Sequence, residues 1–387
     1  MSVLMQAPAG VTNVTVATSG TTYTPNAAGQ ISAQNSDVAY LLGLGFTAIS
    51  GPANYLANFR NLLHGGDFSV NPFQRNIAGL ASGGVISSAI SNTVTYFADR
   101  WFAVGGSSSA ILMAAVADTS VQGFSQSLKV SRQSGNANTA AINFGQVLET
   151  ARAICAQGQQ VTLSFYAKQG ANYSGGTLAV SVISGTGTNQ SAANMVAGSW
   201  TGQASSVTGS VTLSTSMTRY SITGNIPAGA TQLGVLFTWT PSGTAGTDDS
   251  VTFNGLQLEI GGTPSAFEHL DPEVVLGECQ RFCAAFAEPA SGAVVSGAGM
   301  INGTNSQQVT IPLPTTMWKA PTVTVSAGSF KFNIAGTATA VGAGFAAGST
   351  HTPTMATVVG TVTATAGQAT ALQGGGGSGY IIASSDF

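Results

Sequence analysis

The stretch DDSVTFNGLQLEIGGTPSAFEHLDPEVVLGECQRFCAAF, residues 248–286, decides how this chain of 387 residues is organised. Apolar residues occupy nearly alternate positions in 251–260, which is typical of a β-strand with one face in a core. The alternation breaks at Asn254-Gly255, where we expect a β-bulge. The glycine pair at 261–262 then indicates a turn, so the strand ends there.

A helix is expected after this turn. Asp271 suits the N-cap, Pro272 the first helical position and Glu273 the first turn. Apolar residues then recur at three- and four-residue steps, which gives the helix one apolar face: Val275, Cys279, Phe282, Cys283 and Phe286. This face can pack on copies of itself around a threefold axis, through Val275, Cys279, Phe282 and Phe286, or on its own β-domain. The sequence leaves both packings open.

Short strands dominate on both sides of this helix, so the predicted fold class is mainly β. Ten strands are expected before it, at 93–104, 110–116, 126–132, 140–147, 160–168, 177–183, 206–213, 218–226, 232–239 and 250–260. Ten strands without a long helix between them favour a sandwich or barrel over a parallel sheet. We predict four parts: an N-terminal attachment unit (1–50), a jelly-roll β-sandwich (51–270), a connecting helix (271–287) and a C-terminal β-domain (288–387).

The two flanking parts show weaker patterns. In the N-terminal unit we expect strands at 11–18, 20–24 and 29–32 and a short helix at 38–44. In the C-terminal part we expect strands at 308–313, 322–326, 330–334, 357–365 and 379–384. A piece as short as the N-terminal unit buries little core alone, so we expect it to dock on its own neighbours or on the body to which the protein is attached.

Charged residues make up only 6% of the chain, against roughly 25% in ordinary globular proteins. A monomer with so bare a surface lacks the charges that keep proteins apart in solution, so we expect much of it to be covered by identical subunits or by a larger assembly. The net charge of −3 gives no reason to expect nucleic acid or an anionic membrane as partner. No membrane span or signal peptide is visible, which favours assembly in a cytoplasm.

The three cysteines are expected to be small buried apolar residues. Cys279 and Cys283 lie four apart, and Cys155 stands alone. A metal site needs more ligands than this pair, and no histidine lies closer than His269. We therefore predict no metal and no cofactor.

Two further segments resemble the start of a jelly-roll domain that recurs in fibre proteins of tailed phages and prophages. They are NLLHGGDFSVNPFQR (61–75) and YFADRWF (96–102), which match the family pattern at Gly66, Asp67, Phe68, Asn71, Gln74, Arg75, Tyr96, Asp99, Arg100 and Trp101. Gly65 stands where the family more often has asparagine. The segments 161–170, 253–269, 278–282, 311–326 and 379–387 are similar to later parts of the same architecture, so the resemblance spans about residues 60–387.

The resemblance implies a virion surface protein, built as a trimeric fibre or spike, whose N-terminal unit attaches to other virion proteins. It also implies a jelly roll similar to carbohydrate-binding ones, in which a Ca²⁺ site is common; Asp67 or Asp249 could contribute to such a site. For Arg100 we expect a structural role, in charge-assisted hydrogen bonds with Asp99 or Asp67, while Trp101 enters the core.

Catalytic patterns are missing from the sequence. Among 14 acidic residues no pair has a recognisable spacing of acid and nucleophile, and no serine elbow or phosphate-binding loop occurs. Binding of host-surface polysaccharide is easier to support, because neutral glycans are held by aromatic faces and polar hydrogen-bonding groups. Trp200, Tyr173 and Asn189 lie in or beside polar loops, with Trp200 as the candidate stacking platform, although burial of Trp200 in a core is an equally open reading.

These observations predict a non-enzymatic protein at the virion surface, as a tail fibre, baseplate or head fibre, that binds saccharide. The alternatives are a purely structural decoration protein and a polysaccharide depolymerase spike.

Overall fold

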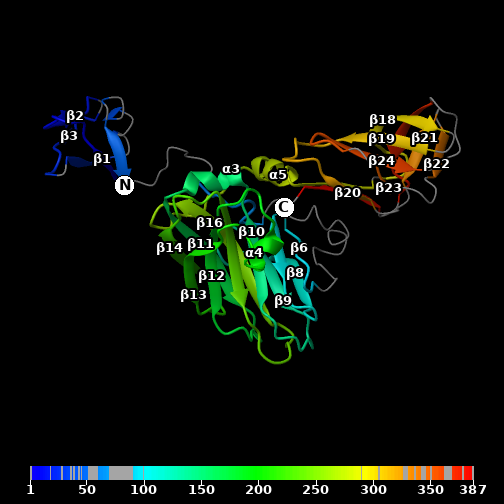
Figure 1. Cartoon of the computed structure of the whole chain (residues 1–387), viewed down its shortest axis with the longest axis horizontal. Helices are drawn as coiled ribbons and strands as arrows, with labels where there is room; N and C mark the ends of the chain where they lie inside the picture. The colour runs from blue at the N-terminus through cyan, green and yellow to red at the C-terminus, as the bar shows by residue number, and fades with distance from the viewer. Residues whose placement is uncertain are drawn as a thin grey trace.

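The computed structural model describes residues 2–50, 60–68 and 90–385, apart from gaps at 18, 28, 35–36, 38–39, 42–43, 45, 99, 289, 304–305, 326–329, 335–336, 341–345, 349–350, 361–367 and 377–378. Sheets dominate this part of the chain and helices are few and short, so the prediction of a mainly β fold is confirmed. Figure 1 shows a small N-terminal group of strands, a large β-sandwich and a C-terminal group of sheets. No helix of the described residues is long and apolar enough to cross a membrane.

The N-terminal unit has a three-stranded sheet and a hairpin. The sheet has the order β4 (Gln30–Gln34), β1 (Ser2–Gln6), β5 (Thr47–Ser50), and the hairpin joins β2 (Val14–Thr15) to β3 (Thr22–Tyr23). The expected hairpin is confirmed, whereas β1 and β5 were missed. Most of the expected helix at 38–44 lies outside the described residues. Buried Asp37 accepts hydrogen bonds from the hydroxyls of Tyr23 and Ser19, which ties the hairpin to this small core.

The β-sandwich consists of two antiparallel sheets. One has the order β13 (Ala204–Val211), β12 (Leu178–Gly185), β15 (Gln232–Trp239), β10 (Ile142–Val147), β7 (Trp101–Val104), β6 (Thr95–Tyr96). The other has the order β14 (Thr218–Asn225), β11 (Gln160–Gln169), β16 (Ser250–Ile260), β9 (Gln126–Arg132), β8 (Ile111–Ala117). Strands are present in each of the expected ranges of this part, although the range 93–104 holds two.

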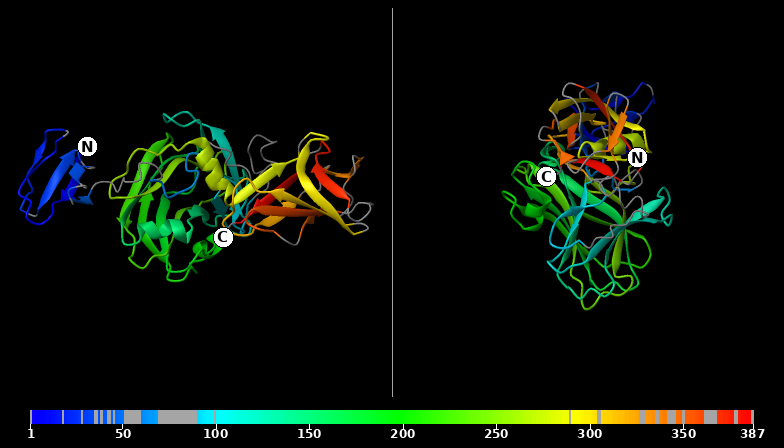
Figure 2. Two further views of the ribbon diagram at one scale, coloured as in Figure 1. Left: turned by 90° about the horizontal axis from the view of Figure 1, so that it is seen from above. Right: turned by 90° about the vertical axis from the view of Figure 1, so that its right-hand side faces the viewer.

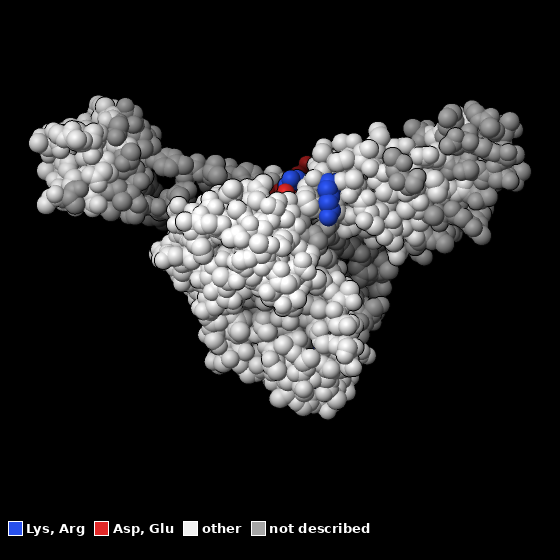
Figure 3. All heavy atoms as spheres, in the orientation of Figure 1, with Lys and Arg blue, Asp and Glu red and all other residues white. Residues whose placement is uncertain are grey.

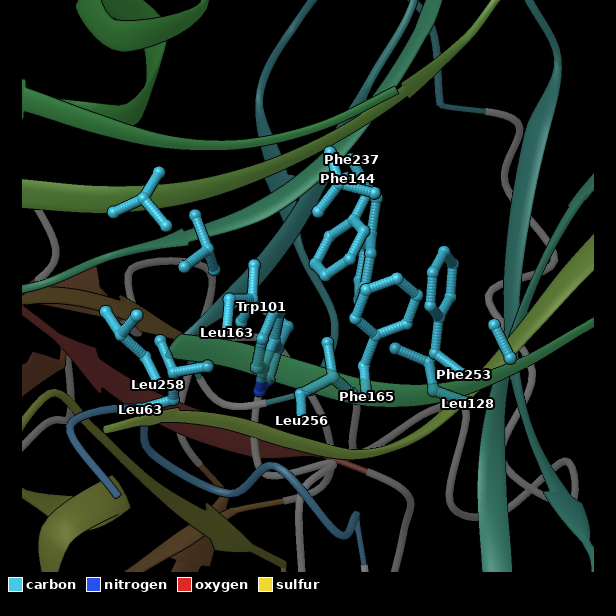
Figure 4. Close-up of a cluster of buried hydrophobic side chains, with 14 of the residues drawn as sticks. Leu63, Trp101, Leu128, Phe144, Leu163, Phe165, Phe237, Phe253, Leu256 and Leu258 are labelled. Carbon is cyan, nitrogen blue, oxygen red and sulfur yellow. The ribbon is translucent and has the colours of Figure 1, made fainter. Parts of the chain in front are cut away.

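Aromatic rings fill the space between the two sheets. Phe144 stacks on Phe253 with ring centroids 4.8 Å apart, and Phe165 meets Phe237 edge-on at 4.9 Å. Figure 4 shows these rings gathered between the strands, with Trp101 and several leucines beside them. Trp101 is fully buried and stacks on Phe144, so its predicted place in the core is confirmed.

The expected strand at 93–104 is split in two. Arg100 has a left-handed backbone conformation, with φ of 70°, and the amide of Trp101 donates to the carbonyl of Ala98 to close a turn between β6 and β7. The turn sends the two neighbouring side chains in different directions. Trp101 enters the core, and Arg100, also fully buried, donates to the carbonyl of Val147.

In the described part of the chain, three short helices pack on the sandwich. Two were not predicted: α3 (Thr150–Ala153), which continues into the 3-10 turn η3 (Ile154–Ala156), and α4 (Ala192–Val196). The third, α5 (Pro272–Gln280), begins as predicted, since the carboxylate of Asp271 accepts the amide hydrogen of Glu273.

The predicted extent of this last helix to residue 287 is wrong. The chain turns at Arg281 and Phe282, and residues Cys283–Ala287 form a strand, β17. Pairing of β17 with β26 (Tyr380–Ser384) supplies a full ladder of backbone hydrogen bonds, and this outweighs the helical spacing of the apolar residues.

The C-terminal part has two sheets. The three-stranded sheet has the order β17, β26, β20 (Thr322–Val325). The seven-stranded sheet has the order β22 (Thr337–Ala340), β21 (Lys331–Ile334), β25 (Ala369–Gln373), β18 (Val294–Gly303), β19 (Ser306–Pro312), β24 (Met355–Gly360), β23 (Ala346–Ala347). The strands expected at 308–313, 322–326, 330–334 and 379–384 are present. Residues 361–365 of the expected strand at 357–365 lie outside the described residues.

A group of charged side chains joins α5 to the sandwich. Glu278 accepts a hydrogen bond from Arg152 at 2.8 Å and lies 3.2 Å from Nδ1 of buried His64. Arg281 pairs with Glu149 on the sandwich side. Burial, helped by the charge of Arg152, lowers the pKa of His64 to about 4, so this histidine is neutral at pH 7. Burial raises the pKa of Glu278, but the hydrogen bond with His64 and the charge of Arg152 outweigh it and lower the pKa to about 2.

The ring of Phe282 packs into the same junction. The guanidinium carbon of Arg100 lies 3.8 Å from the centre of this ring, and the His64 ring meets it edge-on at 5.5 Å. The amide of Ser385, just after β26, donates to the carbonyl of Phe282. Figure 2 shows the sandwich and the C-terminal sheets meeting at α5.

Acid is expected to destabilise the protein from pH 6.5 downwards. An unfolded histidine takes up a proton near pH 6.5, whereas folded His64 does so only near pH 4, so its contribution to stability is complete above pH 6.5 and is lost between these values. Protonation of Glu278 removes further stability between pH 4.5 and 2. Urea unfolding at pH 6.5 to 4.5 should show a free energy that falls by about 1 kcal/mol per pH unit on account of His64.

The His64→Gln variant tests this assignment. It should unfold with a shallower pH dependence than the unchanged protein. Equal slopes for the variant and the unchanged protein would contradict the assignment.

Candidate functional site

Trp200, the predicted stacking platform, is not available to a ligand. It is 3% exposed and packs with α4 against the outer face of the six-stranded sheet, beside Met195 and Ile183. Its indole N–H donates to the carbonyl of Ser191 at 2.8 Å. The prediction of a glycan-binding role for Trp200 is therefore corrected: this large ring fills the gap between α4 and the sheet.

The structure does not bring Tyr173 and Asn189 together. Asn189 lies near Gln232, where β15 begins, and exchanges hydrogen bonds with Thr150 at the start of α3. Tyr173 lies near Trp239, where β15 ends. Eight residues of strand span more than about 20 Å, so the two side chains occupy opposite ends of the sandwich. They cannot form one binding patch.

The predicted interface residues lie at the junction within the single chain. Val275, Cys279 and Phe282 are 6%, 2% and 0% exposed, and Phe286 is half-buried. Phe282 contacts Arg100 and His64 of the same chain. Of the two packings open to this helix, the structure shows the one on its own β-domain.

The cysteines and the acidic residues show no metal centre. Cys279 and Cys283 are buried as predicted, but Cys155 is exposed, which corrects the prediction for that residue. Asp249, a candidate Ca²⁺ ligand, instead forms a buried ion pair with Arg132 at 2.8 Å and accepts two hydrogen bonds from Ser174. In the described part of the chain no group of three or more His, Cys, Asp or Glu is placed to hold a metal ion.

A cluster of four aromatic rings lies on the outer face of the five-stranded sheet, and we call it the aromatic patch: Phe124, Tyr166, Phe267 and His269. Phe124 is at its centre, with ring centroids 5.9 Å from Tyr166, 5.2 Å from Phe267 and 4.9 Å from His269. Phe124 is buried, Tyr166 and Phe267 are half-buried, and His269 is exposed. The patch therefore has a packed centre and an accessible rim.

The bulge in β16 makes room for these rings. The register of β16 against β11 shifts between Ser164 and Tyr166, and Gly255 takes φ of 54°. A Cβ atom on Gly255 would lie 2.9 Å from the Phe124 ring and 3.0 Å from the Tyr166 ring. The bulge predicted at Asn254-Gly255 is thus confirmed, and its glycine lets two rings lie directly on the backbone.

Polar side chains of β16 hold Phe267 in place. Gln257 accepts the amide hydrogen of Glu268 at 2.8 Å, and Glu259 accepts the amide and hydroxyl hydrogens of Ser265 at 2.8 and 2.6 Å. These bonds anchor the chain on both sides of Phe267. The ring is consequently fixed over the sheet by its backbone as well as by its neighbours.

Charged groups lie on the same sheet as the aromatic patch. Lys168 pairs with Asp118 and Lys129 with Asp248. Burial raises the pKa of Asp118, but hydrogen bonds from Lys168 and Ser120 outweigh it and lower the pKa to about 2. Arg219 lies with its guanidinium carbon 5.8 Å from the centre of the Tyr166 ring. Fixed rings with hydrogen-bonding groups at their edge can hold the apolar face of a sugar ring and its hydroxyls.

Much of the remaining surface carries few charged side chains. On the face of the molecule drawn in Figure 3, the visible charged atoms lie where the sandwich meets the C-terminal part, and the drawn surface of the sandwich shows almost none. Among the described residues, the basic groups of the sandwich lie mainly at this junction and around the aromatic patch.

One signal in the sequence could have found part of this patch. In VTLSFYAKQG the alternation sends Leu163 and Phe165 into the core, so Tyr166 must point outward. An aromatic residue at an outward position of a central strand is a candidate for binding. Phe124, Phe267 and His269 come from other segments, and only the folded sheet brings them to Tyr166.

Replacing Gly255 with alanine should destabilise the sandwich and displace the patch. The new alanine must adopt a left-handed backbone conformation, and its methyl group meets two rings. We therefore expect the free energy of unfolding, measured in urea, to fall by about 2 kcal/mol or more. Gly176→Ala is the matched control, because Gly176 has φ of 65° but open space at its Cβ. Equal losses for the two variants would show that the rings do not press on the bulge.

No family model and no curated protein matches this sequence. Solved structures that are similar include the enzymatically active domain of tailspike protein 4 from bacteriophage CBA120 (18% identity, TM-score 0.32), which covers 52% of this chain and 22% of that one. A xylan-binding domain from CBM 22 is similar over 43% of this chain and 90% of its own, with 17% identity and a TM-score of 0.28. The CBM22-1–GH10 modules of Clostridium thermocellum xylanase 10B are similar over 48% of this chain and 29% of their own, with 13% identity and a TM-score of 0.27. At TM-scores this low, the function has to be argued from the chain's own residues.

Proposed function

We propose that this chain is a non-enzymatic surface protein of a phage virion, or of a phage-derived particle, which projects from the particle and binds host-surface saccharide through the aromatic patch. The observation that carries the proposal is the set of fixed rings on the outer sheet face, two of them half-buried and one exposed, with hydrogen-bonding groups at their rim. Sugars present an apolar face and many hydroxyls, so this combination suits them.

The state of the acidic side chains supports binding without catalysis. A glycosidase needs two carboxyl groups that face a substrate and are free to transfer protons or attack. Here Asp249 is held by Arg132 and Ser174, and both carboxylate oxygens of Glu259 accept hydrogen bonds from Ser265 or Gln257. Asp118 and Asp248 are each paired with a lysine. These carboxylates serve the fold, which favours the binding role over a depolymerase spike.

The scarcity of charge supports a place within an assembly. Charged residues are 6% of the chain, and those of the sandwich gather at the junction and around the aromatic patch. The remaining surface has little to oppose contact with sister copies. A homotrimer attached to the particle through the N-terminal unit accounts for this distribution.

Saccharide binding is tested with the full-length protein on an array of bacterial surface polysaccharides. Removing a stacking ring should weaken binding about tenfold, so Phe267→Ala and His269→Ala are expected to lose most of the signal. Tyr40→Ala is the matched control, since Tyr40 is an exposed aromatic residue of the N-terminal unit. Binding that survives both patch variants, or the absence of binding to any polysaccharide, would contradict the proposal.

The assembly is tested by light scattering during size-exclusion chromatography at micromolar concentration. We expect a mass of three chains of 38.6 kDa. A stable monomer would refute the trimer and leave the bare surface without an explanation.

A further inference from the structure

Arg219, at the edge of the aromatic patch, differs from other cations of the described residues. Ion pairs with carboxylates hold Lys129, Lys168, Arg132, Arg152 and Arg281. Arg60, which donates to the same Ser265 as Arg219, lies 3.9 Å from Glu268. Arg219 forms no such pair with a carboxylate of the described residues. The acid closest to it through hydrogen bonds is Glu259, and both oxygens of Glu259 are already bonded to Ser265 or Gln257. Arg219 thus has no carboxylate in direct contact with its guanidinium in the described part of the patch.

The guanidinium of Arg219 is nevertheless held in a fixed position. Its Nη2 donates to the hydroxyl of Ser164 at 3.1 Å and to the carbonyl of Ser265. Arg219 also stands opposite Tyr166 in the register of β14 and β11, and its charge lies beside that ring. Nε and Nη1 have no acceptor among the described residues, and the side chain is half-buried rather than enclosed. Nε and Nη1 donate on different sides of the guanidinium, and each remains available to a ligand.

We propose that the patch selects acidic saccharides, in which a carboxylate on the sugar ring, as in a uronic acid, pairs with Arg219 while the ring stacks on the aromatic side chains. This inference rests on the proposed saccharide binding. A hydrogen bond from a guanidinium to a carboxylate joins two charges, so it is stronger than the bond that the same group forms with a neutral hydroxyl.

The stacking and the charge lie close enough to act on one sugar unit. Tyr166 is shared by both, since its ring contacts Phe124 on one side and has the Arg219 guanidinium carbon 5.8 Å from its centre. Lys168 and Lys129 are nearby but carry their own carboxylate partners, Asp118 and Asp248. Selectivity for the carboxylate is therefore assigned to Arg219 and not to a general basic surface.

The test compares pairs of polysaccharides that differ only in the carboxylate. Polygalacturonate, alginate and hyaluronate are each presented beside their carboxyl-reduced forms, with dextran sulfate as a polyanion control, and binding to the full-length protein is measured at fixed salt. The acidic form of at least one pair should bind at least tenfold more tightly than its reduced form. Arg219→Gln should abolish this ratio, and Arg219→Lys should restore only part of it.

Controls separate this inference from the proposed function. Lys331→Gln removes a cation from strand β21, far along the chain, and should leave the ratio unchanged. Circular dichroism and thermal unfolding confirm that each variant folds. Equal binding of acidic and reduced forms, with both lost in Phe267→Ala, would overturn the acidic selectivity and leave saccharide binding standing. Binding of dextran sulfate as tight as that of the best carboxylate polysaccharide would also overturn the acidic selectivity. If no probe binds, both the acidic selectivity and the proposed saccharide binding are overturned.

Discussion

A single irregularity in strand β16 connects the core, the candidate site and the junction. Gly255 adopts a left-handed conformation, and the one extra residue of the bulge lets the apolar side chains on both sides of it, Phe253 and Leu256, face the same core. The outer side of the bulge lies directly beneath Phe124 and Tyr166. Beyond the bulge, Gln257 and Glu259 anchor the segment that carries Phe267 and leads to the N-cap of α5. A regular strand could not satisfy all of these contacts at once.

Much of the sandwich could be predicted from the sequence because its strands are half-buried. Along β11, for example, Leu163 and Phe165 alternate with Ser164 and Tyr166, and such a pattern has only one satisfactory arrangement in a sheet. The start of α5 was equally clear, because Asp271 and Pro272 act locally. Strands such as β18, rich in glycine and small residues, lack this contrast between faces and were missed.

Apart from the outward position of Tyr166, the candidate site could not be predicted, since distant contacts decide it. Trp200 sits in a polar, glycine-rich sequence that is typical of an exposed loop, yet α4 and the outer sheet face enclose it. The apolar spacing from Val275 to Phe286 continues past the end of α5, but the partner strand β26, about a hundred residues later, turns its last part into β17. The patch likewise joins rings from three segments. The resemblance of the Tyr-x-x-Asp-Arg-Trp segment to phage fibre proteins pointed to a junction residue, Arg100, and not to the site.

The central claim is that saccharide binds on the rings above the β16 bulge. A crystal structure of the full-length protein with an oligosaccharide, galacturonate oligomers being the first choice, tests it most directly. The account predicts a sugar ring against Phe267 and Tyr166, with its carboxylate at Arg219. A sugar bound instead at the loops of Tyr173 or Asn189, at either end of the sandwich, would contradict it.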